Sequence, residues 1–253
     1  MEDSRRAVES KVPAFYAQPD FLHRPRLKEW WTVLHPPYTA LHLSLVTIGA
    51  CLAGPVNVVY LVVTITAFFL AVGIGAHSLD ELHGRPLATS IPAWQLLTAA
   101  SLGIGGAVAL GVVGVFLVSP YLALFIVVGA FVAVFYNLEL LHGRIHTGTV
   151  FVLSWGAFPV LTAYFAQHAT LSVASVLASA FGALVTQIQR QLSTPARALR
   201  RKTRSVDGTI QLTDGTTREI TRDSLLEPLE RALRTLCWSG VVLALALAYL
   251  RLS

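Results

Sequence analysis

Charged residues are almost absent from the middle of this chain. Between Trp30 and Gln189 there are only five, and every other residue is apolar, small or neutral-polar. Over the whole sequence 13% of the residues are charged, whereas an average soluble domain has about 25%. A segment of this kind would expose a continuous apolar surface to water. Most of the chain is therefore expected to lie in a lipid bilayer, and a soluble globular enzyme is excluded.

Seven apolar runs follow one another along the chain. A helix that crosses a bilayer needs roughly 20 apolar residues, and runs of about this kind are separated by turn-like segments such as Gly54-Pro55 and Ser119-Pro120. The sequence predicts an all-α integral membrane protein with about seven transmembrane helices. The expected spans are 38–53, 56–76, 93–118, 121–137, 149–166, 171–185 and 232–250.

Basic residues gather on one side of these spans. Six lie within residues 1–36 and nine within residues 188–231, whereas the short connections on the other side have none. Cytoplasmic loops of membrane proteins carry an excess of Lys and Arg. We therefore expect a multi-pass protein of the plasma membrane, with a cytosolic N-terminus and a C-terminus outside. The net charge of +5 has the same explanation, and nucleic acid is not expected as a partner.

The charge pattern also divides the chain into four parts. They are a cytosolic or interfacial segment (1–36), a core of six spans (37–190), a cytosolic insertion (191–231) and a seventh span (232–253). Within the first part, residues 21–34 place Trp30 and Trp31 beside three cations. This composition fits an interfacial helix and, equally, a solvated basic tail with a tryptophan anchor.

The insertion contains two turn signals, at Asp207-Gly208 and Asp214-Gly215. They predict strands over 209–212 and 217–221, as a small β-hairpin or a three-stranded meander. Asp223 or Ser224 is expected to cap the next helix, with Ser224 and Glu227 as a capping box. A unit this small is expected to be a lid or a contact surface rather than a domain.

The five embedded charges fall in two blocks of one pattern, [Asp/Glu]-x-x-His-Gly-Arg. The first block runs from Asp80 to Arg85 and the second from Glu139 to Arg144. Each block ends a pair of expected spans on the cytosolic side, so we interpret them as an internal repeat. Their charges are either functional or merely interfacial side chains that snorkel or pair, and the repetition favours a polar active site.

Helical spacing brings the acids and histidines of each block together, because residues three or four apart share a face. Glu139, His142 and His146 are expected to form one stripe. At the first block, His77, Asp80 and Glu81 are expected to share a face, and Asp80 is also expected to pair with His83. Imidazole with carboxylate suits Zn, Mn or non-haem Fe, whereas Mg prefers oxygen alone. Such pairs also occur in di-iron helix bundles. The expected metal ligands are His77, Asp80, His83, Glu139, His142 and His146.

Other polar residues near the blocks are expected to serve the same site. Glu81 is interpreted as a bridging ligand or proton shuttle, and Arg85 and Arg144 as groups that bind a polar headgroup or orient carboxylates. These three are the expected catalytic residues. The expected substrate-binding residues are His42, Tyr136, Asn137, Gln187 and Arg190.

The order of these features resembles the UbiA-type intramembrane prenyltransferases over about residues 30–190. The segment Leu34-His35-Pro36-Pro37-Tyr38 resembles the entry to that family's first helix, and Phe135-Tyr136-Asn137 resembles part of its fourth. The stretch from Ala76 to Leu87 takes the place of the family motif Asn-Asp-x-x-Asp-x-x-x-Asp, which is followed by Arg-Pro-Leu. The resemblance implies a helical bundle that binds an isoprenoid diphosphate through Mg ions.

The chain departs from this family at the acidic positions. Of the first motif only Asp80 is kept, since His77 and Gly84 replace its partners, and the expected second motif, at 187–195, contains no acid. The family usually has nine spans rather than seven. Because bridging a diphosphate through Mg takes several carboxylates, we interpret the chain as a UbiA-like scaffold with a rebuilt histidine–carboxylate site.

These observations favour a metal-dependent membrane enzyme that acts on an isoprenoid or long-chain lipid at the cytosolic face. Iron would give oxidative chemistry and require an electron donor as a partner, while Zn or Mn would give hydrolytic or lyase-like chemistry. The alternative is a Mg-dependent prenyltransferase or terpene cyclase, with Asp80 and Glu139 on Mg and arginines on the diphosphate. A second alternative is a non-catalytic carrier or assembly protein.

Overall fold

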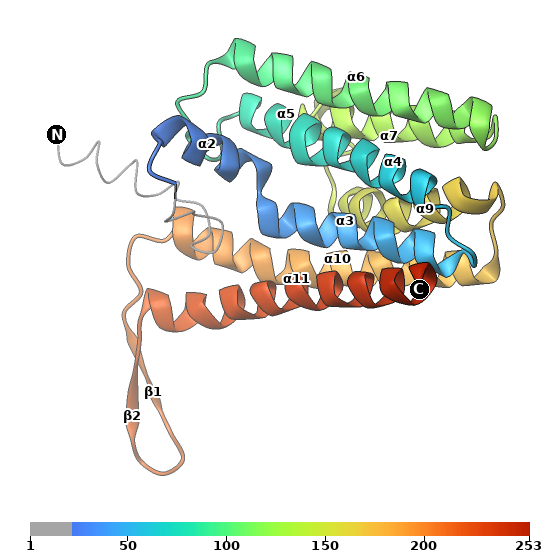
Figure 1. Cartoon of the computed structure of the whole chain (residues 1–253). Helices are drawn as coiled ribbons and strands as arrows, with labels where there is room; N and C mark the ends of the chain where they lie inside the picture. Colours follow the sequence, from blue (N-terminus) through green and yellow to red (C-terminus); the bar gives the residue numbers. More distant parts are fainter. Residues whose placement is uncertain (1–21) are drawn as a thin grey trace.

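Helices that run back and forth along one direction make up most of residues 22–253, the part of the chain that the computed structural model describes (Figure 1). Residues 1–21, with most of the expected N-terminal basic segment, lie outside it. The helical elements are α2 (Pro25–Leu34), α3 (Pro36–Leu52), α4 (Val58–Phe68), η2 (Phe69–Ala76), α5 (His77–Leu82), α6 (Ala93–Leu117), α7 (Leu122–Asn137), η3 (Leu141–Gly143), α8 (Gly148–Val152), η4 (Leu153–Ala157), α9 (Phe158–His168), α10 (Val173–Arg201) and α11 (Arg222–Leu252). The strands are β1 (Gly208–Gln211) and β2 (Thr217–Ile220).

Each of the seven expected spans corresponds to one helical pass, but not all of them are long and apolar enough to cross a membrane. Four described helices are: Val58–Leu82, Ala93–Leu117, Gly148–His168 and Arg222–Leu252. Helix α7 is apolar but shorter, α3 has 17 residues, and α10 is amphipathic. The structure thus has the helices of a membrane protein, and four of the seven expected spans meet the requirement.

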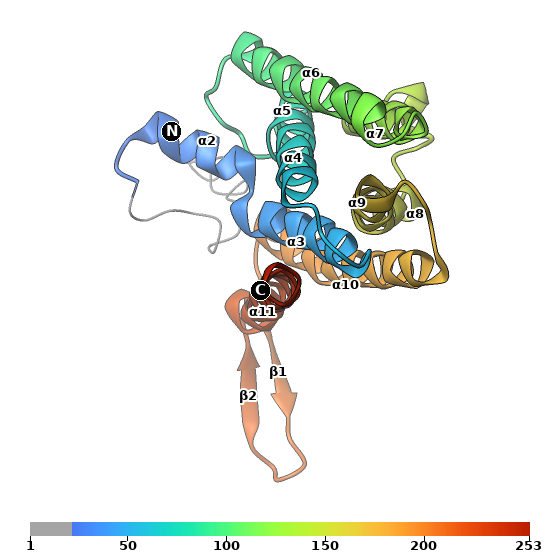
Figure 2. The ribbon, with the colours of Figure 1, turned by 45° about the vertical axis from the view of Figure 1, so that its right-hand side comes forward.

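Small residues allow the helices to approach closely, as is common between helices in membranes. A Cβ atom added to Gly156 in η4 would lie 2.5 Å from the carbonyl oxygen of Gly182 in α10. Similarly, a Cβ on Gly103 in α6 would lie 2.9 Å from the backbone nitrogen of Gly75 in η2. In Figure 2, α6 and α7 lie on one side of α4, while α10 and α11 lie beyond α3.

Two passes contain π-helical segments, η2 and η4. A π-helical turn shifts the backbone hydrogen bonds by one residue and leaves a carbonyl for other donors. In η4, the carbonyl of Trp155 lies 3.1 Å from Nδ1 of His42 on α3. Both π segments face the centre of the bundle, where Val72, Ala76, Trp155 and Tyr136 form one buried apolar cluster.

One end of the bundle holds the segments 83–92, 138–147 and 202–221 (Figure 1). Most of the described basic side chains lie at this end, which we call the basic end. The loops 53–57, 118–121 and 169–172 and the C-terminus lie at the opposite end. Successive loops thus lie at alternate ends of the bundle, as the sequence predicts.

The expected helical stripe of Glu139, His142 and His146 is wrong. Helix α7 ends at Asn137, and the backbone of Glu139 and His142 is left-handed, with φ of 49° and 58°. Helix α5 likewise ends at Leu82, and His83 is extended. A Gly with positive φ follows in both blocks, but the acid precedes the helix end in the first block and follows it in the second. The two blocks therefore match in sequence and differ in conformation.

The prediction of a hairpin in the insertion is confirmed. Strands β1 and β2 pair antiparallel and project sideways from the ends of α10 and α11 (Figures 1 and 2). The predicted cap is wrong, because Thr221 caps α11 and forms the capping box with Ser224. The basic segment with which the expected insertion starts is helical, because α10 continues through Pro195 to Arg201.

Candidate functional site

Polar side chains from α3, α5, α7, α10 and the adjoining segments gather at the basic end. Their mutual electrostatic influence and ring contacts link them across the bundle. We call this group the polar cluster. Its members are His35, Tyr38, His77, Asp80, Tyr136, His146, Arg190, Arg197 and Arg201.

Two buried polar atoms of the cluster have no hydrogen-bond partner within residues 22–253. They are Nδ1 of His35 and Oη of Tyr38. The His77 ring centroid lies 5.9 Å from the centroids of both His35 and Tyr38. Buried polar atoms are nearly always hydrogen-bonded in folded proteins, so this part of the cluster has unused capacity for a polar molecule.

Arginines give the cluster a positive character. Burial, the neighbouring His77, and the charges of Arg201, Arg197 and Arg200 lower the pKa of His35 to about 3. Burial also lowers the pKa of Arg201, with Arg200 and Arg197 acting in the same direction. Asp80 lies among these charges and near His146. A cluster that holds several guanidinium groups close together is suited to binding an anion.

Tyr136 connects the cluster to the interior of the bundle. Its ring stacks on His146 with 4.3 Å between centroids, and it lies 4.8 Å from the ring of Trp155. Nδ1 of His146 donates to the Tyr136 carbonyl at 3.0 Å, while its Nε2 lies 3.9 Å from the Glu139 carboxylate. Arg190 completes this side, with its guanidinium 5.8 Å from the centroid of the Phe151 ring.

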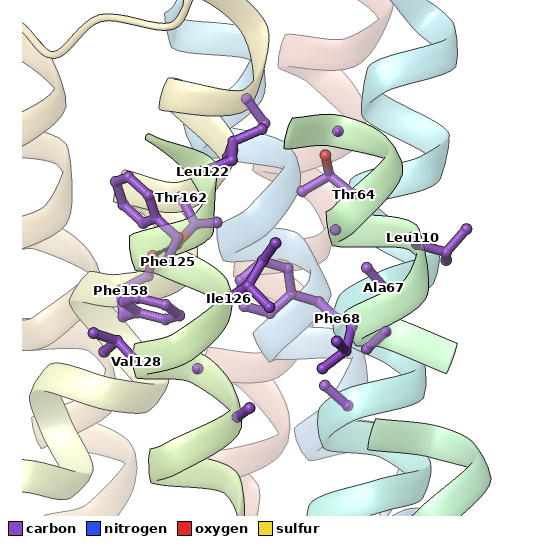
Figure 3. Close-up of a pocket in the computed structure, with 18 of the residues that line it drawn as sticks. Thr64, Ala67, Phe68, Leu110, Leu122, Phe125, Ile126, Val128, Phe158 and Thr162 are labelled. Carbon is purple, nitrogen blue, oxygen red and sulfur yellow. Dashed lines mark hydrogen bonds between the residues drawn. The ribbon is translucent and has the colours of Figure 1, made fainter. Parts of the chain in front are cut away.

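An apolar cavity of about 330 Å³ lies next to the cluster, inside a ring formed by α4, α6, α7 and the pass from α8 to α9 (Figure 3). It extends along α4 and η2 from Val59 to Val72, a length of about 20 Å at the helical rise. Its lining is almost entirely aliphatic and aromatic. Trp155 and Val72 line the end nearest the basic end and also contact Tyr136.

The structure brings together some of the residues expected at the site. His77, Asp80, Tyr136, His146 and Arg190 belong to the polar cluster, and Glu139 lies at its edge through His146. His42 is buried behind Phe68 and Trp155, which line the cavity. In residues 22–253 no group of three or more His, Cys, Asp or Glu side chains is arranged to hold a metal ion.

The other expected site residues have structural partners or lie at the surface. Glu81 is fully buried and accepts hydrogen bonds from the backbone of Leu87 and Thr89. Arg85 donates to the carbonyl of Ile91, and Asn137 donates to that of Ala133. His83, His142 and Arg144 are exposed, and Gln187 is partly buried on α10.

Sequence reasoning did not place His35, Tyr38, Arg197 or Arg201 at the site. Arg190, Arg197 and Arg201 are seven and four residues apart, the spacing of one helix face. This signal was lost because the sixth span was expected to end before Pro195, whereas α10 continues to Arg201. Tyr38 was hidden in an apolar run.

Comparison with models of known protein families, with characterised proteins and with solved structures gives no match for this chain. The fold and the site therefore define its class. It is an α-helical membrane protein with an apolar cavity between its helices that ends beside an arginine-rich polar cluster.

Proposed function

We propose that this protein binds an isoprenoid-type lipid with a phosphate-bearing headgroup and transfers or cyclises its chain. One observation carries the proposal. Trp155 lines the apolar cavity, and the Tyr136 ring beside it lies in the electrostatic neighbourhood of Arg190 and Arg197. An amphiphile with its chain in the cavity has its headgroup at these arginines.

Charge favours a phosphate or diphosphate as the headgroup. Guanidinium groups form strong, often paired hydrogen bonds with phosphate oxygens, and the three arginines of the cluster lie on one face of α10. Asp80 is the one carboxylate among the cluster members. This balance of charge favours an anion over a free metal cation.

The aromatic layer between the cavity and the cluster supports prenyl transfer as the reaction class. Loss of diphosphate from an allylic carbon leaves a cation, which the faces of aromatic rings stabilise. Tyr136, Phe151 and Trp155 lie where the carbon next to the headgroup would be, with ring centroids 4.8 to 6.1 Å apart. Asp80 and His146 are two groups of the cluster that can accept a proton from an attacking nucleophile.

The donor set does not fit the magnesium cage of the family that the sequence resembles. Such a cage takes several carboxylate oxygens. Near the cluster, the Glu81 carboxylate already accepts three hydrogen bonds from the 83–92 segment, so Asp80 and the peripheral Glu139 are left. We therefore assign headgroup binding to the arginines themselves.

The test is a binding measurement on the purified full chain in nanodiscs. Farnesyl diphosphate is expected to bind more tightly than farnesol or inorganic diphosphate, since only it engages both halves of the site. Loss of a hydrogen bond to a charged group costs about 1.5–3 kcal/mol. Arg197→Gln or Arg201→Gln should therefore weaken binding by roughly 10- to 100-fold.

Arg231→Gln, on the exposed surface of α11, is the matched control and should have no effect. Equal binding of farnesol and farnesyl diphosphate contradicts the proposal.

A metal-dependent lipid enzyme is the second candidate, favoured by the pairing of Glu139 with His146 at 3.9 Å and by the nearness of Asp80 to His146. These donors are of the types that Fe, Zn and Mn accept. Elemental analysis of the purified protein tests it. This candidate predicts that the wild type contains near-stoichiometric metal, that Asp80→Asn and His146→Ala lose it, and that His83→Ala keeps it. A metal-free wild type rules against the candidate.

We also propose that all seven passes cross the plasma membrane with the basic end in the cytosol. The alternation of the loops and the excess of Lys and Arg at the basic end support this orientation. Labelling of a single cysteine at Thr213 from the cytosolic side only, and at Ser253 from outside only, is the expected result.

A further inference from the structure

The end of the cavity that lies away from the polar cluster is lined by residues of α4, α6 and α7. Tyr60, in the first turn of α4, lines the cavity there together with Leu117 and Leu122. Its hydroxyl donates to the carbonyl of Leu117, with an O···O distance of 3.5 Å. Leu117 is the last residue of α6, where a helix leaves its carbonyls without an internal donor.

Tyr60 is thus held at both ends. Its backbone belongs to α4, whose cap Asn57 accepts hydrogen bonds from the nitrogens of Val59 and Tyr60. Its hydroxyl lies within hydrogen-bonding distance of a carbonyl of α6. A ring with contacts to both helices forms a wall at this end and has less freedom to move aside for a long ligand than a side chain without them.

We infer that Tyr60 limits the length of the chain that the cavity accepts. The inference rests on the proposed function, in which the headgroup is fixed at the arginines and the chain extends toward Tyr60. At about 330 Å³ the cavity is at the small end of ligand pockets, which span roughly 300–1,000 Å³. A chain that reaches the wall gains nothing from further carbons, so the protein selects shorter isoprenoids.

The test compares prenyl diphosphates of increasing length, beginning with geranyl diphosphate, on the full chain in nanodiscs. Each methylene that is buried raises affinity by about fourfold, so wild-type affinity rises with length until the wall is reached and then stops rising. Tyr60→Ala moves this limit to a longer chain. Tyr60→Phe keeps the ring and loses the hydrogen bond, and it keeps the limit or moves it less. Tyr121→Ala, at an exposed tyrosine of the same end that does not line the cavity, leaves the limit unchanged.

The corresponding free alcohols separate this inference from the proposed function. If alcohols and diphosphates bind equally and Tyr60→Ala lengthens the limit for both, the headgroup proposal fails and the role of Tyr60 holds. If diphosphates bind more tightly and the limit is the same in wild type and Tyr60→Ala, the role of Tyr60 is overturned and the proposed function holds. If neither series binds, both are overturned.

Discussion

Nδ1 of His42 donates a hydrogen bond to the backbone carbonyl of Trp155, 3.1 Å away on a different pass. The direction is fixed, because a carbonyl only accepts, so Nδ1 carries the proton and Nε2 has a free lone pair. That Nε2 is buried and has no partner in the described part of the chain. The bond ties α3 to the π segment whose tryptophan separates the cavity from the polar cluster.

Replacing His42 by Phe is therefore expected to destabilise the protein. The ring would still fill the space, but the Trp155 carbonyl would lose its donor inside the bundle, at a cost of about 1–3 kcal/mol. The measurement is thermal unfolding in detergent, followed by tryptophan fluorescence. His168→Phe, at an exposed position at the opposite end, is the control. Equal melting temperatures for the two variants contradict this role of His42.

Glu81 is predicted to stabilise the 83–92 segment. Its buried carboxylate accepts from the backbone nitrogens of Leu87 and Thr89, each at 2.9 Å. Glu81→Ala leaves these donors unpaired and should cost about 3 kcal/mol. Hydrogen exchange at the two amides, measured by mass spectrometry, should become much faster. Glu29→Ala removes the more exposed bonds to Ser90 and should cost about 1 kcal/mol. Unchanged exchange in Glu81→Ala would show that other contacts hold the segment.

The sequence predicted those features of the fold that depend on a single local pattern. Apolar length and turn residues gave the helical passes and their order, and Asp214-Gly215 gave the hairpin turn. Cap positions were missed by two or three residues, because Thr221, Asp223 and Ser224 are all good caps. Which of these three residues caps α11 depends on where the hairpin ends and the helix begins.

The site was only partly predictable, because two pairs of residues with the same spacing in the sequence can have different backbone conformations. The spacing of Asp80 and His77 was read correctly, since both lie on α5. The same reasoning failed for Glu139 and His142, because α7 had already ended and the chain turns through left-handed conformations. No spacing pattern marked Tyr38 as a site residue, because it joins the cluster through its ring contact with His77, a residue far away in the sequence.

The buried ion pair between Arg200 and Glu230 is predicted to hold the basic ends of α10 and α11 together. The two side chains are 11% and 1% exposed. Breaking a buried pair leaves an uncompensated charge and typically costs about 3–5 kcal/mol, so Glu230→Gln should lower the melting temperature strongly. The exposed pair of Arg231 and Glu227 is the control, and Glu227→Gln should cost under about 0.5 kcal/mol.

A double replacement distinguishes a buried charge effect from simple loss of packing. Arg200→Met combined with Glu230→Leu removes both charges and should recover most of the stability that Glu230→Gln loses, because apolar pairs of similar volume often replace buried ion pairs without cost. A double variant as unstable as the single one would mean that packing rather than charge pairing holds the two helices together.

His35 is predicted to make the stability of the protein depend on pH. Its pKa in the folded protein is about 3, because burial and nearby positive charge oppose protonation, whereas the unfolded chain titrates near its ordinary value of 6.5. The unfolded state then binds more protons below pH 6.5, so stability is fully present above this pH and falls as the solution becomes more acidic. At pH 5 the loss should be about 2 kcal/mol, or a melting temperature lower by about 4–8 °C. His35→Gln cannot titrate, so the difference in melting temperature between pH 7 and pH 5 should be smaller in this variant by that amount. The same difference in both proteins would exclude His35 as the source of the pH dependence.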